Sequence, residues 1–262
     1  MNIKFLLRFH LVVFFTLIIF SQNISAQNNY DLHQFWNESL TFAQQPLHWQ
    51  GEDWLKLGIS TAATAAVMQA DQPIKDAAMK DQSHLNSFPV KAGKFYGEIY
   101  PAAIVAGGFG LYGYLADNQP SKKIAFETVQ TVLYAGAITT ILKIAIGRAR
   151  PYTDKGIATF QPFKPFNDDF HSFPSGHATM AFSLSTVLAN NTNSLPLKIL
   201  AYVPAIVTCG SRVYQNMHWT SDVLAGAAIG YFVGNWVSGQ HENSEEQKVT
   251  FTPPFNLRIA LF

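Results

Sequence analysis

Six apolar segments of helical length follow one another along the chain, separated by polar and helix-breaking residues. They cover residues 55–68, 99–116, 124–146, 178–188, 197–207 and 223–237. Turn signals such as Asn118-Gln119-Pro120 and Asn190-Asn191 stand between them. Strand-like alternation is nearly absent from this stretch. The pattern therefore predicts an all-α fold, a helical bundle of about six helices.

The first 26 residues have the pattern of a secretory signal peptide. Lys4 and Arg8 precede an apolar core over residues 11–20, and small residues follow up to Ala26. The apolar run is much shorter than the ~20 residues that a membrane-spanning helix needs. We therefore expect an exported chain that begins at Gln27 after cleavage, with an uncleaved anchor helix as the alternative.

Three further segments complete the expected domain organisation. Residues 27–54 combine tryptophans with polar residues and are expected to form an amphipathic lead-in, on a membrane interface or over the helical core. Residues 55–240 are predicted to form the helical domain. Residues 241–262 are predicted to be a polar tail with a short C-terminal strand. The terminal Phe262 is typical of outer-membrane barrels, but no barrel pattern precedes it, so an outer-membrane location is not expected.

The amino-acid composition limits the kinds of molecule that the chain is expected to bind. The net charge is +1 and no stripe of lysine and arginine with interleaved aromatics is present, so nucleic acid is not an expected partner. Charged residues make up 13% of the chain, against about 25% in soluble domains, which favours buried helices or membrane contact. The single cysteine, Cys209, excludes an internal disulfide and a cysteine metal cluster.

Three short clusters combine cations or histidines with helix-end signals. In the first, Lys143 and Arg150 are seven positions apart, so on a helix they share nearly one face, and Pro151 would stop that helix. Two such cations suit an anion with several oxygens, although basic residues at a helix end are more often dipole partners. Arg148 would point about 140° away from Lys143, which leaves it a supporting or substrate contact.

The second cluster is Pro174-Ser175-Gly176-His177, which has the pattern of a helix start. Free N–H groups at a helix N-terminus bind anions, and Gly176 would let the backbone approach a ligand closely. His177 would then face the anion. A simple helix cap with a surface histidine is the alternative for this cluster taken alone.

The third cluster runs from Ser211-Arg212 to His218 and Asp222. On a helix, the i, i+4 spacing would let the Asp222 carboxylate hold one ring nitrogen of His218 and leave the other free to attack. A single histidine and aspartate at this spacing are more often structural.

Taken together and in this order, the three clusters resemble the signature of the type 2 phosphatidic acid phosphatase and vanadium haloperoxidase superfamily. The matching patterns are Lys143-x6-Arg150-Pro151, Pro174-Ser175-Gly176-His177 and Ser211-Arg212-x5-His218-x3-Asp222. The resemblance implies a helical bundle in which the three motifs meet at one end.

The resemblance also implies a role for each signature residue. His218 would attack phosphorus and become phosphohistidine, with Asp222 orienting it, and His177 would protonate the leaving group and later activate water. The expected phosphate-binding residues are Lys143, Arg150, Ser175, Gly176 and Arg212. Positioning and charge neutralisation are what phosphoryl transfer needs, so we expect no metal and no other cofactor.

The expected function is hydrolysis of phosphate monoesters or pyrophosphates, with a phosphorylated lipid or a small phosphate ester as the substrate. A soluble periplasmic acid phosphatase of broad specificity and a vanadium-dependent haloperoxidase are the alternatives. The expected location is the cell envelope, either the inner membrane with a periplasm-facing site or the periplasm. If residues 55–68 do not cross the membrane, the motifs face the periplasm, and Lys122, Lys123 and Lys198 face the cytoplasm.

Overall fold

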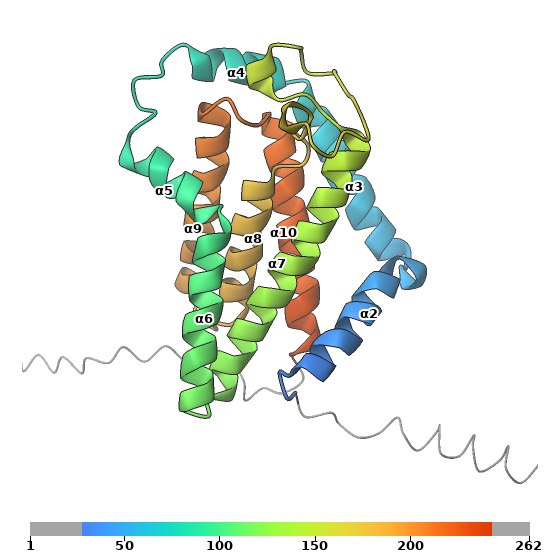
Figure 1. Ribbon diagram of the computed structural model, residues 1–262, viewed down its shortest axis with the longest axis vertical. Helices are drawn as coiled ribbons and strands as arrows, with labels where there is room; N and C mark the ends of the chain where they lie inside the picture. Colours follow the sequence, from blue (N-terminus) through green and yellow to red (C-terminus); the bar gives the residue numbers. More distant parts are fainter. Residues whose placement is uncertain (1–27, 243–262) are drawn as a thin grey trace, which may run out of the picture.

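The computed structural model describes residues 28–242, which fold as an all-α bundle (Figure 1). Its α-helices are α2 (Leu32–His48), α3 (Gly51–Met68), α4 (Asp71–Met79), α5 (Phe88–Tyr96), α6 (Ile99–Leu115), α7 (Gln119–Ile146), α8 (Gly176–Asn190), α9 (Leu195–Tyr214) and α10 (Thr220–Gln240). The predicted all-α bundle is confirmed, with α2, α4 and α5 in addition to the six expected helices. The predicted signal peptide and C-terminal strand lie outside the described residues.

The centre of the bundle is the pair α8 and α10, which pack closely because glycines line their interface. Gly226, Gly230 and Gly234 recur every four residues on α10. A Cβ atom at these positions would lie 2.3 Å from the Ser175 oxygen, 2.4 Å from the Thr179 oxygen and 2.8 Å from Thr186 Cβ, respectively. Small residues at this spacing let helix backbones approach each other, as in membrane helix pairs. Helices α7 and α9 pack on α8, and α6 packs on α7 (Figure 1).

Residues 27–54 are largely helical where the structure describes them. Asp31 caps α2 by accepting a hydrogen bond from the Gln34 N–H, and Pro46 lies within the last turns of this helix. The helix continues only two residues beyond Pro46, to His48. Helices α2 and α3 form a bent arm along the side of the bundle (Figure 1).

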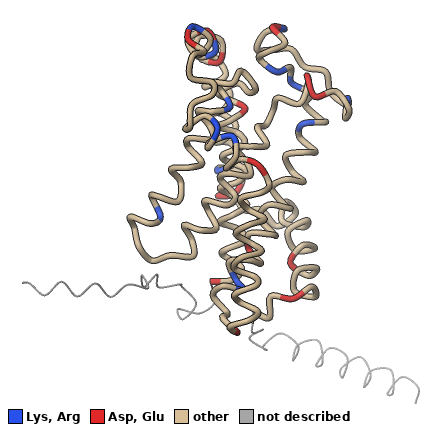
Figure 2. Tube along the Cα trace, turned by 60° about the vertical axis from the view of Figure 1, so that its left-hand side comes forward, with Lys and Arg blue, Asp and Glu red and all other residues tan. Residues whose placement is uncertain are grey.

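Large apolar side chains cover the outer surface of α6, α7 and α9. Ile104 and Leu111 on α6, Ile141 on α7 and Ile206 on α9 are each more than 60% exposed. Among the described helices, α7 alone is long and apolar enough to cross a membrane by length and composition, and α6 is apolar but shorter. Charged residues gather mainly toward the end of the bundle that carries α4, the upper end (Figures 1 and 2).

The lower end of the bundle holds a buried polar cluster that fastens α2 to α7 and α10. His241 is completely buried; its Nδ1 lies 3.2 Å from Glu127 Oε1 and its Nε2 lies 3.1 Å from Glu38 Oε2. Since carboxylates only accept hydrogen bonds, both ring nitrogens donate and the ring is a cation. Burial opposes this charge, but the hydrogen bonds to Glu127 and Glu38 raise the pKa of His241. Asn191 donates a further hydrogen bond to Glu127.

Candidate active site

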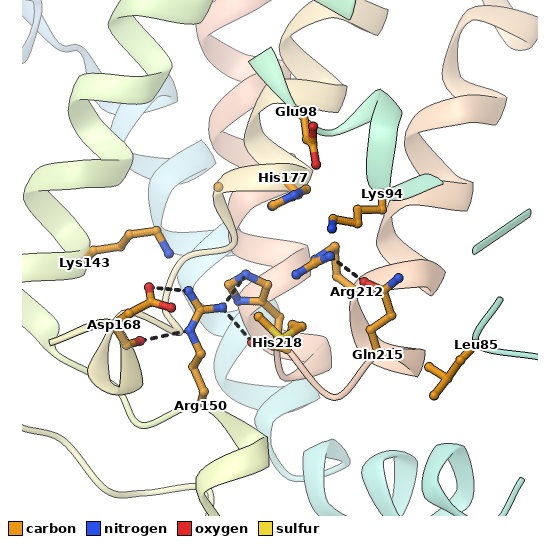
Figure 3. A pocket seen from close by; sticks show the side chains of 12 residues that line it. Leu85, Lys94, Glu98, Lys143, Arg150, Asp168, His177, Arg212, Gln215 and His218 are labelled. Atoms are coloured by element: carbon orange, nitrogen blue, oxygen red, sulfur yellow. Dashed lines mark hydrogen bonds and ion pairs between the residues drawn. The ribbon is translucent and has the colours of Figure 1, made fainter. Parts of the chain in front are cut away.

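A polar cavity of about 640 Å³ opens at the upper end of the bundle, where α5, α7, α8 and α9 have their ends (Figure 3). Four cations, two carboxylates and two histidines contribute to its walls. The charged residues that line it are Lys94, Glu98, Lys143, Arg150, Asp168 and Arg212. The excess of cations favours an anionic ligand.

Lys143 and Arg150 reach this cavity because the chain turns sharply between them. Helix α7 ends at Ile146, and Gly147 adopts a left-handed conformation (φ 61°). A Cβ atom at Gly147 would lie 2.0 Å from the Gln161 oxygen, so only glycine fits this turn. The expectation that both cations share one helix face, with Pro151 as the stop, was wrong. Arg150 instead lies in extended backbone beyond the helix.

The guanidinium of Arg150 stands between the 147–175 loop and His218. Its Nη2 donates to Asp168 Oδ1 at 2.7 Å, and its Nη1 lies 3.1 Å from the Met217 oxygen and 3.3 Å from His218 Nε2 (Figure 3). The Asp168 carboxylate is 69% exposed. A carboxylate and a phosphate both offer oxygens to arginine, so Asp168 occupies a position that a phosphate oxygen could take.

His218 has one ring nitrogen without a proton, and its tautomer follows from its contacts. Nδ1 lies 2.8 Å from the backbone oxygen of Ser172. Because a carbonyl oxygen can only accept, Nδ1 carries the proton and Nε2 keeps a lone pair toward Arg150 and the cavity. Complete burial, with the nearby cations Lys143 and Arg150, holds the pKa of His218 well below its usual value.

Asp222 lies behind His218, away from the cavity. Its Oδ2 is 3.9 Å from His218 Nδ1, too far for a hydrogen bond, and accepts from the hydroxyl of Ser172 and the N–H of Trp219. The expected i, i+4 pairing on one helix does not form, because His218 precedes α10, which begins at Thr220. Asp222 therefore caps α10 and fixes Ser172, whose carbonyl in turn holds His218.

A buried arginine connects Asp222 to the N-terminal part of the chain. Arg148 Nη1 donates to Asp222 Oδ1 at 2.7 Å, and its Nη2 donates to Asp71 Oδ2 at 2.8 Å. Asp71 also accepts from the N–H of Ser221 at 2.9 Å and from its hydroxyl. Arg148 is 1% exposed and does not line the cavity. Of the two roles left open for it, the structure places Arg148 in support of Asp222.

The start of α8 brings Gly176 and His177 to the cavity. The Ser175 hydroxyl accepts from the N–H of Ala178 and is completely buried. Ser175 therefore caps the helix, as the alternative for this cluster proposed, and does not line the cavity as its expected phosphate-binding role requires. His177 Nε2 is buried without a hydrogen-bond partner among the described residues. Burial and then the nearby cations, Arg212 first, lower the pKa of His177 to about 3.

Arg212 comes from the last turn of α9 and forms the opposite wall. Its Nη1 donates to Gln215 Oε1 at 2.6 Å, whereas its Nε has no partner within residues 28–242 (Figure 3). A buried guanidinium N–H without a partner is costly, which favours an acceptor supplied by a ligand. The structure thus brings Lys143, Arg150, Gly176, His177, Arg212 and His218 together around one cavity.

Four further residues contribute to the site or support it and are not predicted from the sequence. Lys94 and Glu98 line the cavity from α5 and the start of α6, Asp168 comes from the long loop, and Asp71 supports Arg148 from α4. Ser87 followed by Pro89 is a helix-start signal that could have indicated α5. Within residues 28–242, no three His, Cys, Asp or Glu side chains form a metal-binding group.

Comparisons with known proteins agree with the arrangement of these residues. The family model of the PAP2 superfamily matches residues 125–246, a range that contains all eight predicted site residues. A lipid A 1-phosphatase of Rhizobium johnstonii is 38% identical over 103 residues, covering 38% of this chain and 41% of the relative. An undecaprenyl-diphosphatase of Sulfolobus acidocaldarius is 29% identical over 118 residues, covering 45% of this chain and 53% of the relative. The similarity thus spans about half of these relatives or less.

One solved structure has a similar fold over most of its length. The crystal structure of a transmembrane PAP2 type phosphatidylglycerolphosphate phosphatase from Bacillus subtilis matches with a TM-score of 0.54 and 24% sequence identity. The match covers 74% of this chain and 95% of the other. At this identity the likeness establishes the architecture of the bundle.

Proposed function

Since the chain belongs to the PAP2 superfamily, we propose that it is a metal-independent phosphatase of phosphorylated lipids that works through a phosphohistidine on His218. One observation carries the proposal: the unprotonated Nε2 of His218 faces a cavity walled by Lys143, Arg150 and Arg212. An uncharged imidazole is a nucleophile, and three cations are what the transferring phosphoryl group requires.

The first step begins when a phosphate replaces the Asp168 carboxylate on Arg150. The lone pair of His218 Nε2 forms a bond to phosphorus while the ester P–O bond breaks. The imidazole ring then carries a positive charge, which the Ser172 carbonyl and the buried Asp222 carboxylate stabilise. The three cations and the N–H of Gly176 at the start of α8 hold the phosphoryl oxygens.

His177 is placed to protonate the departing oxygen, because its side chain lines the cavity and its Nε2 has no hydrogen-bond partner within residues 28–242. With its pKa at about 3 it is neutral before substrate binds, so the charge of the bound phosphate must first raise this pKa. In the second step His177 takes a proton from water, which attacks phosphorus and breaks the N–P bond. Inorganic phosphate then leaves, and His218 is restored.

A groove beside the cavity favours a lipid over a small ester. It has a volume of about 830 Å³, lies between α6 and α7 and shares Glu98, Lys143 and His177 with the polar cavity. Its walls are otherwise mainly apolar, including Tyr100 and Leu133. A hydrocarbon chain in this groove would leave its phosphate beside His218. The names of the relatives, which include lipid A 1-phosphatases, are consistent with such a substrate.

We further propose that the bundle lies in the inner membrane with its cavity toward the periplasm. The apolar outer surface of α7 supports a membrane location. Lys122 and Lys198 lie near the lower ends of α7 and α9, and lysines are more frequent on the cytoplasmic side. Release of the native chain from envelopes by a carbonate wash would contradict this location.

Trapping the intermediate tests the reaction. Purified protein is mixed with ³²P-labelled phosphatidic acid in detergent and quenched during turnover, and acid-labile, base-stable label on the protein is measured. We expect label on the wild type and on His33→Ala, a control at an exposed histidine of α2, and none on His218→Ala. Phosphatase activity that survives in His218→Ala would overturn the mechanism. Faster hydrolysis of a water-soluble ester, without detergent, would instead favour a broad-specificity phosphatase.

A further inference from the structure

Lys94 is a cation of the cavity that does not belong to any of the three motifs. It lies in the last turn of α5 and points toward the space beside Arg212 and His177 (Figure 3). It forms no ion pair with any carboxylate of residues 28–242, although Glu98 is only four positions away. A lysine in the last turn suits the helix dipole. That effect does not require a position in the cavity, and Lys91 of the same helix does not line it.

The position of Lys94 is fixed by the packing of α5 on α9. The hydroxyl of Thr208 donates to the Gly93 oxygen and that of Ser211 to the Val90 oxygen, both at 2.8 Å. Gly97 then brings the chain against α8: a Cβ atom there would lie 2.8 Å from His177 Cβ. Lys94 is therefore held in a fixed relation to Arg212 and His177 by backbone contacts on either side of it.

Lys94 lies on the side of the cavity from which the leaving group departs. The attacking atom, His218 Nε2, is at the floor beside Arg150, and His177, the expected acid, lies across the cavity from it (Figure 3). In-line displacement places the leaving group opposite the nucleophile. Lys94 stands between His177 and Arg212, so its ammonium lies on the side of the cavity where His177 meets the leaving group.

We propose that Lys94 binds the second phosphate of a diphosphate substrate and makes this chain select lipid diphosphates over lipid monophosphates. The inference rests on the proposed function and names its substrate class. His218 attacks the terminal phosphorus, the bond from that phosphorus to the bridging oxygen breaks, and the electron pair stays on the departing lipid monophosphate. Lys94 neutralises the charge that develops there, which lessens the need for a proton from His177.

Two substrates with the same tail test the proposal. Kinetics of the detergent-solubilised full chain are measured on farnesyl diphosphate and farnesyl monophosphate for the wild type, Lys94→Met, Lys94→Arg and Lys91→Met. We expect Lys94→Met to lower the ratio of kcat/KM for diphosphate to that for monophosphate by about tenfold, the size of one lost hydrogen bond to a charged group. Lys94→Arg should retain most of the ratio, and Lys91→Met all of it.

The outcomes separate this inference from the proposed function. If Lys94→Met lowers kcat/KM equally for both substrates, or for neither, the ratio of the two values is unchanged. That result would overturn the role of Lys94 while leaving the phosphatase proposal intact. Failure of the wild type to hydrolyse either substrate would count against the proposed function itself. Because the Lys94 side chain is exposed, we expect the thermal midpoint of Lys94→Met to be close to that of the wild type. Such a result excludes a general structural effect of the substitution.

Discussion

The carboxylate of Asp71 can be removed to test whether the N-terminal helices support His218, the proposed nucleophile. Asp71 is 1% exposed and accepts hydrogen bonds from Arg148, from the Ser221 N–H and from the Ser221 hydroxyl. In Asp71→Ala these donors lose their acceptor in a site without access to water. Arg148 keeps Asp222 as its remaining carboxylate partner.

The expected loss of stability follows from these contacts. Removing one partner of a buried ion pair costs about 3–5 kcal/mol, and the lower end applies here because Arg148 stays paired with Asp222. For a domain of this size, 3 kcal/mol corresponds to a fall of about 6–12 °C in the thermal midpoint. Arg148 also positions Asp222, which fixes Ser172 and so His218. If the loss of Asp71 displaces Arg148, His218 should move as well, and kcat should fall on the order of tenfold or more.

Thermal unfolding of the protein in detergent, followed by tryptophan fluorescence, measures the effect. Asp76→Ala is the matched control, since Asp76 lies on the same helix with its side chain exposed. Its midpoint should stay within about 2 °C of the wild type. A double-mutant cycle with Arg148→Met should give a coupling free energy of about 1–3 kcal/mol. A thermal midpoint of Asp71→Ala equal to that of Asp76→Ala would contradict this role of Asp71. So would purely additive effects of Asp71→Ala and Arg148→Met on the free energy of unfolding.

Further predictions concern the reaction and the lower end of the bundle. Activity should persist in excess EDTA and be inhibited competitively by vanadate; loss on chelation that a divalent ion restores would show that the cations do not suffice. His177→Ala should slow alkyl phosphates far more than p-nitrophenyl phosphate, whose leaving group needs little protonation, and equal losses on both would remove His177 from acid catalysis. The raised pKa of His241 stabilises the fold below the ordinary histidine pKa of about 6.5, and this contribution should disappear as pH rises through the raised value. Thermal midpoints from pH 6 to 9 should therefore fall more steeply for the wild type than for His241→Gln, and parallel curves would contradict the cationic ring.

The sequence motifs predicted most of the residues that line the cavity, but they did not predict the backbone path that brings those residues together. Lys143 and Arg150 were expected together on a helix face, yet they meet because Gly147 ends α7 in a left-handed turn. His218 and Asp222 were expected as a helical pair, yet Asp222 acts through Ser172. The order of the motifs along the chain predicted which residues meet at the cavity, whereas the path of the backbone depends on turns that residue spacing does not encode.

Two of the missed residues, Lys94 and Asp71, lie on short helices whose position depends on packing. Helices α4 and α5 have nine residues each, too few for their apolar periodicity to stand out. Lys94 reaches the cavity because the hydroxyls of Thr208 and Ser211 hold the backbone of α5. Asp71 supports the site because the buried side chain of Arg148 forms an ion pair with it. Contacts between residues more than seventy positions apart in the sequence cannot be read from local pattern.

The ion pair between Asp71 and Arg148 also determines how much of the chain must stay together as one folding unit. The stretch shared with the PAP2 superfamily begins at residue 125, so it contains Arg148 and Asp222 but lacks Asp71. Moved alone into another protein, that stretch would carry a buried arginine with one of its two counter-charges missing. One buried carboxylate therefore ties the N-terminal helices to the stretch that the family model matches. A fragment that begins before Asp71 keeps both counter-charges of Arg148, whereas one that begins at residue 125 keeps only Asp222.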